Sequence, residues 1–138
     1  MATPRRRPGM RKTTTLIAVL VIGGTLLPGL SHASDNGATR ITVTLGDYRF
    51  TPHQLTINSG QTLVLELHNT DSITPHNFTL KNRDGGLDVD VDVPAGGQRE
   101  VELTPKVPGS YTFYCSKKLL FMKSHRERGM EGTLVVTP

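Results

Sequence analysis

Four side chains of the sequence could together bind a soft metal ion, namely two histidines, one cysteine and one methionine. They are His76, Cys115, His125 and Met130. Two imidazoles, one thiolate and one weak thioether form the ligand set of a trigonal copper site with a long axial bond. Structural zinc prefers four strong ligands, and hard ions prefer oxygen. The residue types therefore indicate copper.

Cys115 is the only cysteine among the 138 residues, so it cannot form a disulfide within the chain. In an oxidising compartment such a thiol needs an explanation, although a lone buried cysteine often acts only as a small apolar residue. A bound metal ion would keep the sulfur deprotonated and protect it from irreversible oxidation. A ligand role for Cys115 would therefore explain the single thiol.

The first 33 residues have the composition of a secretory leader. Five cations come first, an apolar run at 16–27 follows, and small residues suited to cleavage complete the order. The run is shorter than the ~20 residues needed to span a bilayer, which favours a cleaved leader over a permanent anchor. We therefore predict a signal peptide at 1–33, a flexible lead-in at 34–39, one domain at 40–138, and a periplasmic location. The alternative is an uncleaved anchor.

The excess positive charge belongs to this leader. The whole chain carries 16 Lys and Arg against 12 Asp and Glu, a formal charge of +4. Without the five leader cations, 11 cationic residues remain against the same 12 acidic ones, for a charge near −1. Nucleic-acid binding needs a cationic footprint on the folded domain, so this class of partner is excluded.

The rest of the chain alternates apolar and polar residues with the period of β-strands. His76 shares one strand face with Phe78 and Leu80, and Cys115 shares another with Phe113, so both donors should point inward. Gly and Pro turns separate the strands, and no long helical pattern occurs. We predict an all-β fold, an antiparallel Greek-key sandwich or barrel of seven or eight strands. The expected strands are 41–45, 54–58, 63–68, 76–81, 87–93, 101–103, 111–115 and 132–137.

An ordered series of short motifs resembles the cupredoxins, the small blue copper proteins. The motifs are Phe50-Thr51-Pro52, Asn58-Ser59-Gly60, Leu67-His68-Asn69, Pro75-His76-Asn77-Phe78, Pro94-Ala95-Gly96, the run from Gly109 to Cys115, and the run from His125 to Val136. The resemblance implies one type 1 copper ion, with His76, Cys115 and His125 as equatorial ligands and Met130 as the axial ligand. Asn77 and Ser116 flank the ligands and are expected to hydrogen-bond around them.

One departure from the family pattern is the nine residues between Cys115 and His125, because plastocyanin-like proteins have far fewer. This long loop combines an apolar centre with cations, as expected for docking of an acidic redox partner such as a cytochrome or a membrane oxidoreductase or permease component. It resembles periplasmic cupredoxins found with bacterial ferrous-iron permeases. An extra helical turn packed on the sandwich is the alternative for the apolar run. The expected docking residues are Lys117, Lys118, Leu119, Leu120, Phe121, Met122, Lys123, Arg126 and Arg128.

One-electron transfer by an exported monomer is the favoured function. The sequence leaves open ferrous-iron oxidation coupled to iron uptake, copper delivery without electron transfer, and a structural sandwich. A Cys-His hydrolase is disfavoured, because no third orienting residue or oxyanion loop is recognisable. A second, labile metal site is a further hypothesis. It would use His53, His68 or the row Asp88, Asp90 and Asp92.

Overall fold

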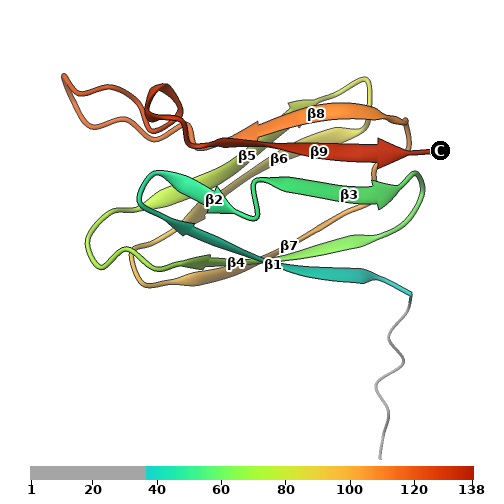
Figure 1. The fold of residues 1–138 in the computed structure, drawn as a ribbon, viewed down its shortest axis with the longest axis horizontal. Coiled ribbons are helices and arrows are strands. Elements are labelled where there is room, and N and C mark those ends of the chain that lie inside the picture. Colours follow the sequence, from blue (N-terminus) through green and yellow to red (C-terminus); the bar gives the residue numbers. More distant parts are fainter. Residues whose placement is uncertain (1–36) are drawn as a thin grey trace, which may run out of the picture. The chain divides into compact units, whose positions relative to one another are not determined.

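The computed structural model describes residues 37–138, which form two β-sheets that enclose one core (Figure 1). The first sheet has the strand order β2-β1-β4-β7, with β1 at Thr39–Gly46, β2 at Arg49–Thr51, β4 at Leu63–Asn69 and β7 at Gln98–Leu103. The second sheet has the order β3-β9-β8-β5-β6, with β3 at Gln54–Asn58, β5 at His76–Asn82, β6 at Leu87–Val93, β8 at Gly109–Tyr114 and β9 at Glu131–Thr137. The predicted signal peptide lies outside the described residues.

The all-β sandwich expected from the sequence is confirmed, with two differences in detail. The structure has nine strands, because the three-residue strand β2 is too short to show an alternation of its own. Two of the strand pairs, β1 with β4 and β3 with β9, are parallel, so both sheets are mixed. Alternating hydrophobicity reports which face is buried and not which way a strand runs, so the sequence could not show these parallel pairs.

An aromatic cluster fills the core directly beneath the end of the sandwich that carries the candidate ligands. Phe50, Phe78 and Phe113 are buried, with ring centroids 4.9 to 5.9 Å apart. Phe78 lies two residues after His76 on β5, and Phe113 lies two residues before Cys115 at the end of β8. Gly132 is needed beside this cluster, because a Cβ atom there would clash with the Phe113 ring and the His53 carbonyl.

Helical structure in the described part of the chain is limited to one 3₁₀ turn, Arg126–Arg128, in the segment between β8 and β9. No helix within residues 37–138 is long and apolar enough to cross a membrane. The segment projects from the end of the two sheets in Figure 1, where it is drawn in orange to red.

Candidate metal centre

Three of the four candidate ligands converge at one end of the sandwich. His76 is the first residue of β5, Cys115 directly follows β8, and His125 caps the 3₁₀ turn. The Nδ1 atoms of the two histidines are 3.0 Å apart, and Cys115 Sγ is 3.4 Å from His125 Nδ1 and 3.8 Å from His76 Nδ1. Within residues 37–138, this is the sole group of three His, Cys, Asp or Glu residues able to share a metal ion.

These separations fit a single ion. Metal bonds of about 2.0 Å to imidazole nitrogen and 2.3 Å to thiolate sulfur place two donors roughly 3 to 4 Å apart. Met130 joins the group from the residue before β9 and is fully buried. Its N–H donates to the His125 carbonyl, and its own carbonyl accepts from the Cys115 N–H, both at 3.0 Å. The donor set of two imidazoles, a thiolate and a thioether matches copper better than zinc.

Burial sets the protonation of the donors when no metal is bound. It raises the pKa of the Cys115 thiol, although hydrogen bonds from the backbone N–H groups of Asn77 and Lys117 act in the opposite direction. It also lowers the pKa of His125, with the neighbouring His76 as a second cause. A neutral thiol and a neutral imidazole therefore face each other, and metal binding must displace the thiol proton.

A carboxylate orients the first histidine. His76 Nε2 lies 2.8 Å from Asp71 Oδ2, which accepts the Nε2 proton and leaves the Nδ1 lone pair free to bind metal. The other oxygen of Asp71 accepts from the Asp47 N–H at 3.2 Å. Asp71 was not expected at the site from the sequence. An acidic residue in a polar turn is too common a pattern to be singled out.

Asn77 connects the strand of one ligand to the loop of another. Its side chain accepts from the Ser116 N–H and donates to Ser116 Oγ, both at 2.8 Å, and its own N–H points to Cys115 Sγ at 3.4 Å. Asp90 accepts from the Asn77 amide at 2.9 Å. The structure thus places both residues expected around the ligands, Asn77 and Ser116, in one network with the sulfur. A donor aimed at the sulfur stabilises its thiolate form.

Tyr48 covers both histidines and was also missed. Its ring meets His125 edge-on with centroids 4.8 Å apart and His76 at 6.0 Å, and the Arg128 guanidinium lies 4.3 Å above it. Tyr48 and Asp47 form the two-residue turn from β1 to β2, and both have positive φ, 58° and 50°. Such turns normally take Asn-Gly or Asp-Gly. A tyrosine in this left-handed conformation is uncommon, which suggests that its ring serves the site.

A cleft opens beside the site. It has a volume of about 330 Å³, and His125 contributes to its wall while His76, Cys115 and Met130 do not. Its other lining residues are Tyr48, Ile73, Thr74, Pro75, Lys117, Lys118, Leu119, Met122, Lys123 and Arg128. The imidazole of His125 is therefore the ligand that reaches this cleft.

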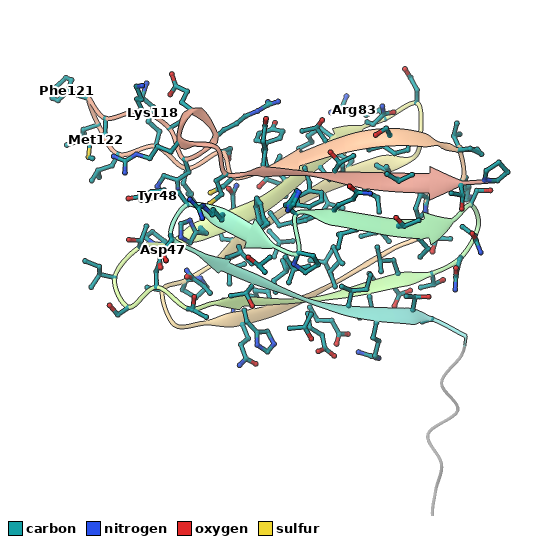
Figure 2. All side chains as sticks on the ribbon, viewed as in Figure 1. Asp47, Tyr48, Arg83, Lys118, Phe121 and Met122 are labelled. Carbon is teal, nitrogen blue, oxygen red and sulfur yellow. The ribbon has the colours of Figure 1, made fainter. Side chains whose placement is uncertain are left out.

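The apolar run 119–122 forms a tight exposed turn. Met122 N–H donates to the Leu119 carbonyl at 2.9 Å, and His125 N–H donates to the Lys117 carbonyl at 2.8 Å to close the base of the loop. Figure 2 shows Lys118, Phe121 and Met122 on this projecting loop, with Tyr48 near its base. The alternative of a helical turn packed on the sandwich is not what the structure shows.

The hypothesis of a second, labile metal site receives no support from residues 37–138. Neither His53 nor His68 belongs to a metal-binding group. The acidic row on β6 is already partnered: Asp88 pairs with Lys81 and Asp92 with Lys117, while Asp90 accepts hydrogen bonds from Asn77 and Thr79. These ion pairs and hydrogen bonds account for the row without a metal ion.

Comparison with known proteins agrees with this geometry. Residues 16–136 match the family model described as a cupredoxin-like domain. Among solved structures, auracyanin from Roseiflexus castenholzii aligns with 20% identity over 72% of this chain and 98% of its own, with a TM-score of 0.59. Auracyanin A, a "blue" copper protein from Chloroflexus aurantiacus, aligns with 22% identity over 73% and 100%, with a TM-score of 0.55. A mutant plastocyanin of fern aligns with 23% identity over 70% and 100%, with a TM-score of 0.51. At these identities the structural matches establish the fold.

Proposed function

Because the chain belongs to the cupredoxin-like family, we propose that it carries single electrons between redox partners through one type 1 copper ion. The resemblance seen in the sequence is thereby confirmed for the family, and copper is the cofactor that the family and the ligand set share. One observation carries the proposal. Three donors converge at a buried end of the sandwich, and the edge of one of them reaches an open cleft.

The residues have distinct roles in this proposal. Copper would supply the Cu(II)/Cu(I) couple, and the chain would hold it in one cage in both states. His76, Cys115 and His125 would provide the strong ligands, and the thioether of Met130 would provide a weak one. The hydrogen bonds of Asn77 and Asp71 hold the cage, so the ligands need little rearrangement when the charge changes.

His125 is the proposed route for the electron. His125 is 7% exposed, whereas His76, Cys115 and Met130 are each 0% exposed. A partner seated in the cleft therefore approaches the copper through this imidazole while water stays away from the other ligands.

We further propose that the partner is a redox protein with an acidic face. Lys118, Lys123 and Arg128 line the cleft and make no ion pair among the described residues, whereas Lys117 pairs with Asp92 and Arg126 pairs with Glu131. Three cations around an apolar cleft steer an anionic surface to the copper edge and chiefly raise the association rate. In this scheme the protein acts as a monomer. The leader-like residues 1–33 support a periplasmic location.

Ferrous-iron oxidation is not part of the proposal. That hypothesis requires an iron-binding carboxylate patch beside the copper, and the cleft at His125 has no carboxylate in its lining. The carboxylates next to His76 are already engaged, since Asp71 is bonded to His76 and to the Asp47 N–H, and Asp92 is paired with Lys117. Copper delivery is also disfavoured, because three of the four ligands are fully buried and release of the ion would require the site to open.

A visible absorption titration of residues 34–138 with Cu(II) tests the copper site. We expect an intense thiolate-to-copper charge-transfer band that saturates at one equivalent, and no such band in Cys115→Ser. Voltammetry of the same sample should then show reversible one-electron reduction. A missing band, or a band that survives in Cys115→Ser, would overturn the ligand assignment. A normal band without reversible reduction would overturn electron transfer alone.

A further inference from the structure

The tip of the loop between Cys115 and His125 presents apolar side chains that face away from the protein. Phe121 is 101% exposed and Leu120 is 78% exposed, and neither lines the cleft beside the metal centre. Their neighbours Leu119 and Met122 contribute to the cleft, so the turn has two sides. Figure 2 shows Phe121 at the outer end of the projecting loop. Leu120 and Phe121 therefore lie outside the cleft proposed for the redox partner.

The backbone holds this tip in a defined shape. The Met122 N–H bonds the Leu119 carbonyl at 2.9 Å, and Leu120 has a positive φ of 37°. A bulky residue with positive φ is unusual. Leu120 therefore combines an uncommon backbone conformation with a side chain that is largely exposed.

Charges are arranged around the tip rather than on it. Lys118 and Lys123 flank the four apolar residues symmetrically. The one acidic residue of the segment, Glu127, accepts from Ser124 N–H and Ser124 Oγ, and the charges of Lys118 and Lys123 help to lower its pKa. The two charges that directly flank the apolar residues in the chain are nevertheless both cationic.

We propose that residues 118–123 insert their apolar tip into the surface of a bilayer that contains anionic phospholipid. Leu120 and Phe121 enter the boundary between headgroups and acyl chains, and the lysine stems follow the apolar surface while their ammonium groups contact lipid phosphates. A protein partner is the alternative that the test must exclude, because protein interfaces are enriched in phenylalanine and methionine although lysine is depleted there.

The insertion and the electron-transfer proposal share Lys118 and Lys123, which line the cleft. They differ in the other residues, because Leu120 and Phe121 would contact lipid and His125 would face a redox partner. Vesicle binding requires no electron transfer, so it can be tested independently of that function.

The first experiment is sedimentation of the copper-loaded protein with vesicles. Residues 34–138 are the suitable chain, because they form a compact unit and contain all nine strands and the four ligands. We expect binding to an equal mixture of phosphatidylglycerol and phosphatidylcholine and weak binding to pure phosphatidylcholine. Replacing Leu120 and Phe121 together by serine should lower binding about tenfold. Lys118→Gln should lower it about fivefold, as expected for one cation near an anionic surface.

A matched control is Val107→Ser, which removes an exposed apolar side chain from the turn between β7 and β8. Its vesicle binding should equal that of the unaltered protein. The charge-transfer band of every variant should be unchanged, which shows that the site and the fold are intact.

A second experiment uses the absence of tryptophan from the chain. Phe121→Trp places a single fluorophore at the tip, and Val107→Trp places one outside it. In the reduced, copper-loaded protein, we expect mixed vesicles to shift the emission of Phe121→Trp to shorter wavelength and to leave Val107→Trp unchanged. Brominated lipid should quench only the tip fluorophore.

Three outcomes would overturn the proposal. If the double serine variant binds vesicles as tightly as the unaltered protein, the attraction is due to charge without insertion. If the unaltered protein binds no vesicles and the double serine variant binds an acidic redox protein more weakly than the unaltered protein does, the tip belongs to the surface for the protein partner. No vesicle binding, combined with self-association that the same variant abolishes, would assign the tip to a second copy of the chain.

Discussion

The two ligand-bearing regions at the end of the sandwich are built in opposite ways. The start of β5, with His76 and Asn77, is buried and each polar side chain there has hydrogen-bond partners. The loop between Cys115 and His125 leaves four consecutive apolar side chains exposed and is closed by only a few backbone hydrogen bonds. Both regions lie next to the same sulfur atom. An electron carrier needs this combination, because its metal must be held rigidly while its surface must meet and leave other molecules.

Two phenylalanines give the largest test of the difference, because Phe113 on β8 stacks on Phe78 of the rigid β5 and Phe121 belongs to the exposed loop. Phe113→Ala opens a cavity beneath Cys115 in the aromatic cluster and should lower the free energy of unfolding by about 3–5 kcal/mol. Phe121→Ala removes an exposed side chain and should change it by less than about 0.5 kcal/mol. Urea denaturation of the metal-free protein measures both. Similar losses in the two variants would mean that the loop packs on the sandwich.

The next largest effect should come from the hydrogen bonds of the rigid region. Asn77→Ala removes the link between β5 and Ser116, and copper affinity should fall by about 10- to 100-fold. Competition with a chelator measures this affinity. Asn58→Ala is the control, since it removes an exposed bond to Thr137 at the far end of β9. Equal copper affinity in the two variants would show that the Asn77 network does not support the site.

Sequence reasoning recovered the rigid region better than its surroundings. His76 and Cys115 stand out because each continues an alternating strand pattern, and Asn77 and Ser116 stand out because they flank these ligands in the chain. Asp71 and Tyr48 reach the site from turns. Tyr48 lies between β1 and β2 and Asp71 between β4 and β5, so their positions depend on how the two sheets pack together, and no local pattern encodes such long-range placement.

The exposed region should control rates rather than affinity for copper. In the double variant with Lys118→Gln and Lys123→Gln, association with a redox protein that has an acidic face should slow by about tenfold at low salt. The association rate should also depend less strongly on the salt concentration. The absorption band should be unchanged, because neither lysine contacts a ligand. Stopped-flow reduction at several ionic strengths measures the rate. Unchanged rates at every salt concentration would remove these two lysines from the docking surface.

A small effect on stability and on copper release should come from the residue that joins the two regions. Tyr48→Gly relieves a left-handed conformation that costs a tyrosine roughly 1–2 kcal/mol, and it also removes the ring contacts with His125 and Arg128. The two changes should nearly cancel, so the free energy of unfolding should stay within about 1 kcal/mol of its original value. Copper release to a chelator should nevertheless become several-fold faster, since the ring no longer covers the imidazole. Tyr48→Phe keeps the ring and should release copper at the original rate. If Tyr48→Gly stabilises the protein and leaves copper release unchanged, the turn strain has no connection with the metal centre.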